Sequence, residues 1–208
     1  PVDLYTGQIN LSATDFMVVG RMPLGVTRVY RSGSTYQGMF GRGWNLLLNE
    51  RIFVLSTNGN LLLRRNNSDR DEFINARDGN YLSPRGCYDT LSRKPDGSYL
   101  LRHKHASQRL YNSDGCLTEL RDPDGNQLLF SYQPGGKQPI NAVSDYSHYT
   151  NAILVARDYR LSRVEIAHSN ILSGRYIDFL YDDSGRVTNA TDFSGRSWSY
   201  EYDAEGRG

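Results

Sequence analysis

Apolar and aromatic residues recur at every second position in several short stretches of this chain, each of which follows a glycine. The stretches are Leu128, Phe130 and Tyr132 after Gly125; Ile177, Phe179 and Tyr181 after Gly174; and Trp198, Tyr200 and Tyr202 after Gly195. A period of two places the alternate side chains on one face of a β-strand. The pattern therefore predicts strands with one buried face, each begun by a tight turn.

Two of these stretches belong to an internal repeat. Residues 111–132 (YNSDGCLTELRDPDGNQLLFSY) align without a gap with residues 181–202 (YDDSGRVTNATDFSGRSWSYEY), and Tyr, Gly, Thr, Asp, Gly and Tyr coincide. Each copy carries two glycines ten residues apart. A unit of this size corresponds to two strands and two turns.

Aspartates precede the turn glycines at a fixed distance. Three of them stand three residues before a glycine, in the pairs Asp182 and Gly185, Asp192 and Gly195, and Asp203 and Gly206. A carboxylate at this position accepts backbone N–H bonds within the turn, while glycine adopts the left-handed conformation. We interpret these aspartates as turn residues.

The amino-terminal half contains further turn signals. Gly41 and Gly43 flank Arg42, and we expect this sharp turn to deliver Trp44, Leu46 and Leu48 to one face of a strand. Asn-Gly or Asp-Gly pairs at 58–59, 78–79 and 96–97 predict hairpins. The polar residues 64–72 predict an exposed loop, and 133–151 predict an insertion.

Composition agrees with a fold built from strands. The 208 residues include 15 Tyr and 20 Gly, and windows compatible with a long helix are almost absent. Aromatic residues favour half-buried strand surfaces, and glycine suits tight turns. We predict an all-β chain of many short antiparallel strands, with one domain over residues 1–140 and a repeat wall over residues 141–208.

Charge and cysteine content exclude several functions. Lys and Arg number 24 against 23 Asp and Glu, and the net charge of +1 favours neither nucleic-acid binding nor an anionic membrane. No apolar stretch approaches the roughly 18 residues of a membrane span, so we expect no membrane insertion. Cys87 and Cys116 are widely separated, and we expect two unpaired thiols and no zinc site.

Residues 181–188 (YDDSGRVT) and 202–207 (YDAEGR) resemble the YD repeat of Rhs proteins, Tc-toxin C components and teneurins. The shared features are Tyr181, Asp182, Gly185 and Arg186, and then Tyr202, Asp203 and Gly206. The amino-terminal half resembles the entry domain that precedes the repeats in bacterial Rhs proteins, in the segments 1–7 (PVDLYTG), 15–16 (DF), 28–32 (RVYRS) and 40–44 (FGRGW).

This resemblance implies a structural role. Repeats of this family wind into a β-shell, or cocoon, that holds a carboxy-terminal toxin, so the expected partners are the remainder of the shell and the enclosed toxin domain. Some members are delivered by type VI secretion in competition between bacteria, which adds a spike or loading region as a partner. In those members the loading region separates before a proline, so Pro1 is a candidate processing terminus. We expect a protein that is made in the bacterial cytoplasm and then exported, of which this chain is a piece.

The sequence offers no catalytic, cofactor-binding or metal-binding constellation. His103 and His105 alternate and are expected on one strand face, but two histidines do not complete a metal site. No nucleophile elbow surrounds a serine. The motif Asp122-Pro123-Asp124-Gly125 resembles half of the paired aspartates that release Rhs toxins. However, Gly125 stands at the position of the second turn glycine of the repeat, so we interpret the motif as a repeat turn.

Two questions stay open at this stage. The aromatic rows either pack a core or line a cavity, and core packing is favoured for Phe130, Trp198 and Tyr200. The alternative function is a carbohydrate-binding or adhesive β module, which predicts exposed and clustered aromatic side chains. A glycosidase is disfavoured because turn geometry accounts for the regularly spaced aspartates.

Overall fold

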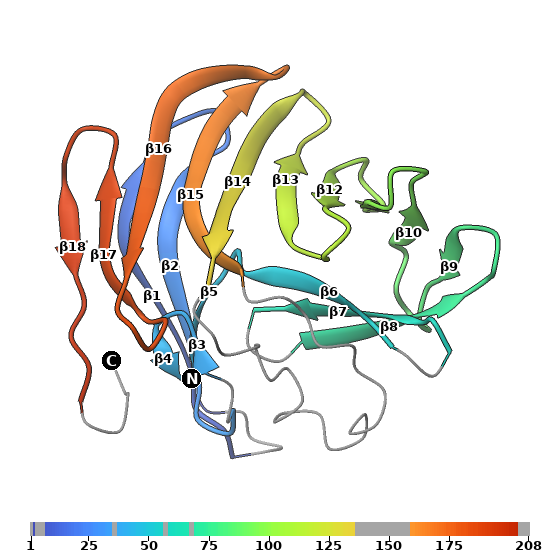
Figure 1. Cartoon of the computed structure of the whole chain (residues 1–208), viewed down its shortest axis with the longest axis horizontal. Coiled ribbons are helices and arrows are strands. Elements are labelled where there is room, and N and C mark those ends of the chain that lie inside the picture. Colours follow the sequence, from blue (N-terminus) through green and yellow to red (C-terminus); the bar gives the residue numbers. More distant parts are fainter. Residues whose placement is uncertain are drawn as a thin grey trace.

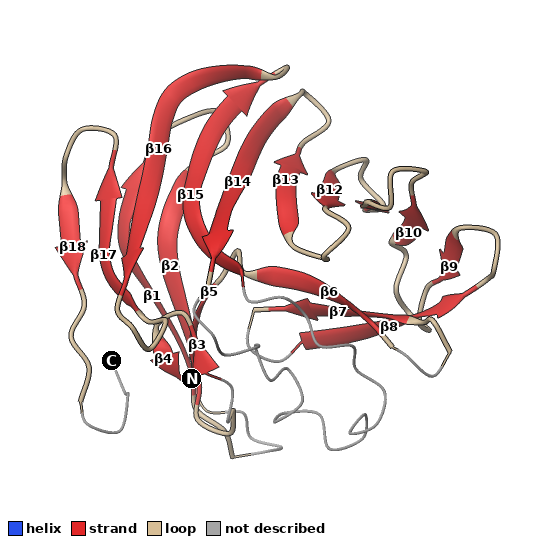
Figure 2. Cartoon of the chain, viewed as in Figure 1, coloured by secondary structure: helices blue, strands red, loops and turns tan. Residues whose placement is uncertain are grey.

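The computed structural model describes residues 2, 7–34, 37–55, 58–66, 69–135 and 159–203. Every helix or strand assigned within these residues is a strand (Figure 2), which confirms the all-β prediction. No described segment forms a helix with the length and apolar character of a membrane span.

One antiparallel sheet of thirteen strands dominates the described residues, and its strands follow one another in sequence order. They are β6 (Glu50–Val54), β7 (Leu61–Arg65), β8 (Asp69–Asn75), β9 (Asn80–Leu82), β10 (Thr90–Arg93), β11 (Tyr99–Arg102), β12 (Gln108–Tyr111), β13 (Leu117–Arg121), β14 (Asn126–Pro134), β15 (Tyr159–His168), β16 (Ile171–Tyr181), β17 (Val187–Asp192) and β18 (Ser197–Ser199). A succession of hairpins accounts for this order, because each tight turn places the next strand beside the previous one.

A smaller sheet is formed by strands near the amino terminus. Its order is β1 (Asn10–Val18), β2 (Leu24–Arg31) and β5 (Trp44–Leu46). A two-stranded hairpin, β3 (Gln37–Gly38) and β4 (Gly41–Arg42), precedes β5. We call β1, β2 and β5 the amino-terminal sheet; it lies against the part of the large sheet that contains β15–β18 (Figure 1).

The large sheet curves so that its first strand returns to the turn between β12 and β13 (Figure 1). The Ile52 N–H donates to the Gly115 carbonyl at 2.9 Å, and Arg51 forms an isolated antiparallel bridge with Cys116. The Tyr111 hydroxyl donates to the Glu50 carboxylate at 3.0 Å. These contacts cover part of the free edge of β6, which would otherwise present unpaired backbone groups.

One continuous core joins the two sheets. Buried residues of the amino-terminal sheet, such as Phe16 and Val26, pack in the same cluster as Val164 and Ile177 of the large sheet. Phe130 is buried in this cluster, and Trp198 and Tyr200 are partly buried and packed against it. Core packing of these three aromatic residues is therefore confirmed.

The expectation of an exposed loop over residues 64–72 is wrong. Arg64 and Arg65 end β7, and β8 pairs with β7 in a regular antiparallel register. Arg65 forms ion pairs with Asp71 and Asp89, and Arg64 is 2% exposed with its guanidinium 5.5 Å from the Phe53 ring. The polar composition of this segment wrongly predicted a loop, because charged side chains on neighbouring strands form ion pairs with one another.

The glycine turn before Trp44 forms as predicted, but the strand that follows it is short. Gly41 and Gly43 both have positive φ, at 89° and 75°. The Trp44 ring is half-buried at 5.1 Å from the Tyr30 ring. Leu48 lies in a turn beyond the end of β5, so the expectation that it shares the strand is wrong. The three predicted Asn-Gly and Asp-Gly hairpins do connect β6 to β7, β8 to β9 and β10 to β11.

The predicted boundary near residue 140 lies outside the described residues, as do Pro1 and Gly206. Strands β14 and β15, on either side of the segment 136–158, pair directly over the register from Asn126 opposite His168 to Pro134 opposite Tyr159. The sheet is thus continuous between the two predicted parts. The division at residues 1–140 and 141–208 stays a prediction.

Two glycine substitutions test the contact that covers the edge of β6. A Cβ added at Gly115 (φ +79°) would overlap the Ile52 carbonyl group, whereas one at Gly195 (φ +88°) would meet no atom within 4 Å. We expect Gly195→Ala to lower the free energy of unfolding by only about 1–2 kcal/mol, because alanine is strained in the left-handed conformation. Gly115→Ala should lower the free energy of unfolding by roughly 1–3 kcal/mol more than Gly195→Ala, because the added Cβ overlaps the Ile52 carbonyl group. Urea unfolding of the two variants measures the difference, and equal losses would contradict the close approach of β6.

Candidate functional site: the repeat turns and the covered sheet face

The predicted turn aspartates act as hydrogen-bond acceptors within their turns. Asp182 accepts the Arg186 backbone N–H and its Nε–H, both at 2.8 Å. The Gly185 N–H donates to the Asp182 carbonyl at 3.0 Å, and Gly185 has a φ of +82°. These contacts confirm the turn interpretation of Asp182, with Gly185 in the left-handed conformation.

Asp192 is the most enclosed of these carboxylates. Its side chain has no exposed surface. It accepts bonds from the Ser194 N–H at 2.9 Å, the Ser194 hydroxyl at 2.7 Å and the Arg196 Nε–H at 2.7 Å. Burial opposes ionisation, but the hydrogen bonds from Ser194 and Arg196 outweigh it and lower the pKa of Asp192 to about 2. Asp203 is exposed, and its partner Gly206 lies outside the described residues.

The first repeat uses the same turn chemistry. Asn112 replaces Asp182, and its side-chain oxygen accepts the Asp114 and Cys116 N–H groups. Asp122 replaces Asp192 and accepts the Asn126 N–H at 2.8 Å. The segment 122–125 is therefore a repeat turn, as its glycine phase predicts.

The tyrosines that close the two repeats play one common role, which sequence reasoning missed. The Tyr132 hydroxyl donates to the Leu117 carbonyl at 2.8 Å, and the Tyr202 hydroxyl donates to the matching Val187 carbonyl at 2.6 Å. Burial raises the pKa of both tyrosines. The available signal was the retention of Tyr rather than Phe at this position in both copies.

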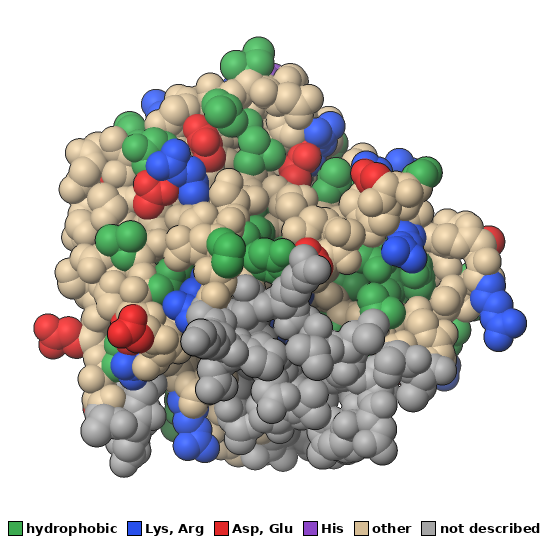
Figure 3. Space-filling model, viewed as in Figure 1, with side chains coloured by type: hydrophobic (Ala, Val, Ile, Leu, Met, Phe, Trp, Pro, Cys, Tyr) green, Lys and Arg blue, Asp and Glu red, His purple; other side chains and the backbone are tan. Residues whose placement is uncertain are grey.

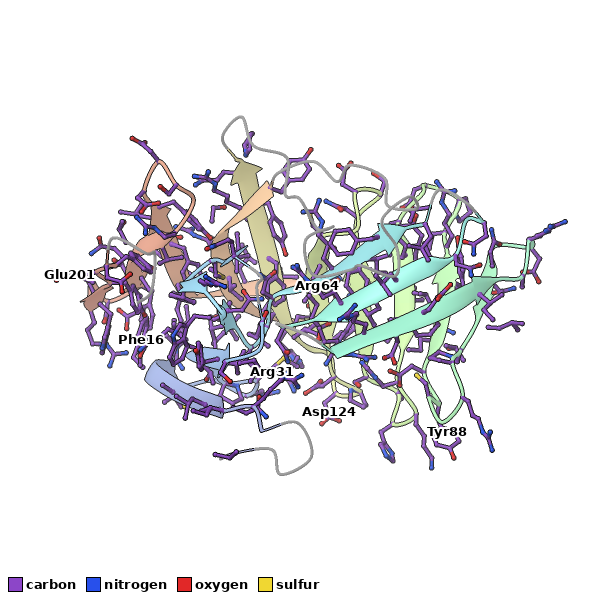
Figure 4. All side chains as sticks on the ribbon, turned by 90° about the horizontal axis from the view of Figure 1, so that it is seen from below. Phe16, Arg31, Arg64, Tyr88, Asp124 and Glu201 are labelled. Atoms are coloured by element: carbon purple, nitrogen blue, oxygen red, sulfur yellow. The ribbon has the colours of Figure 1, made fainter. Side chains whose placement is uncertain are left out.

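The amino-terminal sheet covers the inner face of the large sheet, which we define as the face that carries Leu128, Val164, Ile177 and Ala190. The Phe16 ring stacks on the Trp198 ring with centroids 4.0 Å apart and planes 11° apart. The Phe40 ring meets the Tyr200 ring edge-on at 5.0 Å. Figure 4 shows Phe16 at the end of the molecule that holds β16–β18, and Arg64 over β6–β8.

A polar network crosses the same contact. The Arg28 guanidinium donates two bonds of 2.8 Å to the Asp15 carboxylate, and the Tyr200 hydroxyl donates to Asp15 Oδ2 at 2.8 Å. The guanidinium also lies 5.1 to 5.9 Å from the ring centres of Phe40, Trp44 and Tyr200. Burial opposes the charge of Arg28, yet its hydrogen bond with Asp15 and the Asp15 charge raise its pKa. Burial and then the bond to Asp15 raise the pKa of Tyr200.

Two hydrogen bonds to backbone carbonyl groups complete the attachment. The Val187 N–H donates to the Met39 carbonyl at 2.7 Å, and Arg175 Nη1 donates to the Val19 carbonyl at 2.6 Å. The aromatic stack, the ion pair and these bonds together attach the amino-terminal segment to β16–β18. We call the side chains of Asp15, Phe16, Arg28, Trp198 and Tyr200 the joint.

The candidate metal ligands do not meet. Strand β11 ends at Arg102, and His103 and His105 lie in the turn that follows, so the expectation of a shared strand face is wrong. The His103 Nδ1 atom is 2.9 Å from Asp89 Oδ1, while His105 is exposed. Within the described ranges, no group of three or more His, Cys, Asp or Glu side chains suits a metal ion. Cys87 and Cys116 are both free thiols.

The visible surface carries no dominant charge. Among the described residues on the face in Figure 3, acidic and basic side chains are interspersed rather than gathered by sign. Such a surface is typical of solvation and does not indicate a nucleic-acid interface.

Comparison with known proteins identifies the repeat. Residues 181–207 match the family model "RHS Repeat", and residues 1–73 match the model "Domain of unknown function (DUF6531)". The first match covers the turn of Asp182 and the joint residues Trp198 and Tyr200. These matches support a relationship to the Rhs/YD-repeat polymorphic toxins.

The names of the relatives describe different activities. The chain is 28% identical over 97% of its length to the "tRNA3(Ser)-specific nuclease WapA" of Bacillus spizizenii. It is 26% identical over 94% of its length to the "Double-stranded DNA deaminase toxin A" of Burkholderia cenocepacia, and 26% identical over its whole length to the "Probable deoxyribonuclease RhsB" of Dickeya dadantii. It spans 8%, 14% and 16% of these three relatives.

The buried carboxylate of Asp192 leads to a prediction about acid stability. Because its pKa falls from 3.8 to about 2 on folding, its contribution is present above pH 3.8 and is lost as the pH falls toward 2. Asp192→Ala should lower the free energy of unfolding at pH 7 by about 1–3 kcal/mol, since several donors lose their acceptor. It should also flatten the loss of stability between pH 4 and pH 2. Urea unfolding across this pH range measures both effects.

The exposed Asp183 provides the control for this experiment. Asp183→Ala should retain the stability and the acid dependence of the unchanged chain. A structural role for the buried carboxylate would be contradicted if Asp192→Ala and Asp183→Ala had the same free energy of unfolding at pH 7 and the same loss of stability between pH 4 and pH 2.

Proposed function

We propose that this chain is a non-catalytic wall segment of an Rhs shell, which encloses a toxic domain encoded elsewhere in a longer polypeptide. The observation that carries the proposal is the variety of activities named for its relatives. A tRNA nuclease, a double-stranded DNA deaminase and a probable deoxyribonuclease all contain a segment similar to this one. Reactions so different need different active sites, so a segment common to them suits a shared structural task.

The architecture supports a wall with one closed side. The contacts of Ile52 and Glu50 cover β6 at one edge of the large sheet, whereas β18 at the other edge has β17 as its single strand neighbour among the described residues. A further repeat unit would extend the sheet by pairing with β18. Repeat units of this kind gain stability from such neighbours.

The amino-terminal sheet already covers part of the inner face, which limits where an enclosed domain would lie. Over β15–β18 this face packs against the amino-terminal sheet, with Phe16 on Trp198, and the turn between β3 and β4 adds Phe40 against Tyr200. The amino-terminal sheet therefore acts as a closure at this end. The enclosed domain would lie beyond β18, on the inner side of the repeats that follow.

The cellular role follows from the resemblance to bacterial Rhs toxins. The protein would be made in the bacterial cytoplasm and exported to act on competing cells, with type VI secretion as the proposed route. Its partners would be the remainder of the shell, the enclosed toxin domain and a secretion spike or loading region. Cleavage before Pro1 would separate the shell from that loading region, and the segment itself would need no cofactor, nucleic acid or membrane insertion.

The alternative of a carbohydrate-binding module has less support. It requires clustered aromatic side chains on the surface. Among the described residues, the large aromatic side chains classed as exposed are Tyr88 at 74% and Phe193 at 43%, which follow different strands. The remaining described aromatic rings are buried or half-buried.

Limited proteolysis of the full-length polypeptide tests the proposal. Proteinase K digestion followed by mass spectrometry should leave the toxin domain intact under native conditions, because the shell excludes the protease. The same digestion in a urea concentration that unfolds the shell should degrade the toxin domain. The isolated toxin domain, digested under native conditions, shows whether it resists the protease without the shell.

Rapid native cleavage throughout the toxin domain of the full-length protein would contradict enclosure. N-terminal sequencing of the exported protein tests the processing step separately: a terminus at Pro1 is expected, and residues upstream of Pro1 would overturn that step.

A further inference from the structure

The two repeats differ where the amino-terminal sheet touches them. The repeats share their turn glycines and their closing tyrosines, Tyr132 and Tyr202, but differ at most of the other aligned positions. The positions of Trp198 and Tyr200 in the second repeat are Leu128 and Phe130 in the first. Trp198 and Tyr200 are also the second-repeat side chains in the joint, so two of the positions at which the repeats differ lie at the contact.

We propose that Trp198 and Tyr200 form a recognition pair through which the amino-terminal sheet selects the second repeat and rejects the first. A wall of similar units offers several related surfaces to one covering sheet. A pair of residues that differs between units would determine which unit is covered. This inference concerns folding within the chain and does not depend on enclosure of a toxin.

The hydroxyl of Tyr200 provides polar discrimination. It donates to Asp15 Oδ2 at 2.8 Å, and the Asp15 side chain is 11% exposed. The phenylalanine of the first repeat, Phe130, has no group that could donate to Asp15. A site built to receive a hydrogen bond strongly disfavours an analogue that lacks the donor, because the acceptor is then left short of a partner.

The indole of Trp198 provides shape discrimination. Its ring lies parallel to the Phe16 ring at 4.0 Å, an arrangement that brings two flat surfaces together. The leucine of the first repeat, Leu128, is branched and has no flat face. It is also buried within the core, at 2% exposure.

The first repeat carries a different pair of contacts with a different segment. The Tyr111 hydroxyl donates to Glu50, and the Gly115 carbonyl accepts the Ile52 N–H. At the equivalent places in the second repeat, the Tyr181 hydroxyl donates to the Leu161 carbonyl, and Arg160 approaches Gly185. The first repeat thus contacts Glu50 and Ile52, whereas the second repeat contacts Asp15 and Phe16 through the joint. The two repeats therefore have different partners in the amino-terminal half.

Hydrogen exchange of the whole chain, measured by mass spectrometry, tests the recognition pair. Tyr200→Phe and Trp198→Leu, made singly and together, install the residues of the first repeat. Each should accelerate exchange in β1 and β2 by about tenfold or more, since a hydrogen bond to a charged group or an aromatic stack is lost. Exchange in β10–β12, which lie far from the joint, should not change.

Tyr202→Phe is the matched control, because it also removes one phenolic oxygen from the second repeat. That hydroxyl donates to Val187 within the repeat, so its loss should accelerate exchange near β17 and leave β1 and β2 protected. The recognition pair is overturned if Tyr200→Phe leaves β1 and β2 as protected as in the unchanged chain. It is equally overturned if all strands accelerate together, or if Tyr202→Phe exposes β1 and β2 to the same extent. Should the double variant fail to fold, the Tyr200→Phe and Tyr202→Phe pair decides the question.

Discussion

A sheet built from successive hairpins must satisfy its two edges and its inner face, and the rest of this structure depends on that constraint. An unpaired edge exposes backbone donors and acceptors, and an uncovered apolar face exposes the core. Here the turn that contains Gly115 covers the edge at β6, while the amino-terminal sheet covers the inner face over β15–β18. The edge at β18 is the one left for another repeat in our proposal.

The joint connects this constraint to function. Asp15, Arg28 and Tyr200 form a chain of charged and polar contacts in a half-buried setting, and the Phe16 and Trp198 rings add stacked apolar area beside it. Contacts of this kind specify one arrangement because each polar group has a defined partner. In the proposed shell, a closure fixed in one position would help to keep the enclosed domain inside.

The sequence predicted the features that depend on neighbouring residues. The period-two aromatic rows and the spacing from Asp192 to Gly195 are local signals, and the structure bears out the turn and the strands β14 and β16. Two details of the prediction are wrong: Gly174 lies within β16 rather than in a turn before it, and β18 ends at Ser199, so Tyr200 and Tyr202 lie beyond the strand. Features that depend on distant pairing were missed. The bond between Tyr200 and Asp15 joins residues 185 positions apart, and no local pattern marks it. Polar composition predicted a loop around Arg64 because the cross-strand partners that stabilise such residues are invisible in a linear reading.

Electron cryo-microscopy of the full-length polypeptide would show directly where the toxin domain lies relative to the sheet. We expect the strands after β18 to continue the same sheet, with the amino-terminal sheet at one end and the toxin domain enclosed on the inner side. A separately folded module, with the edge of β18 open to solvent and the toxin domain outside, would contradict this expectation.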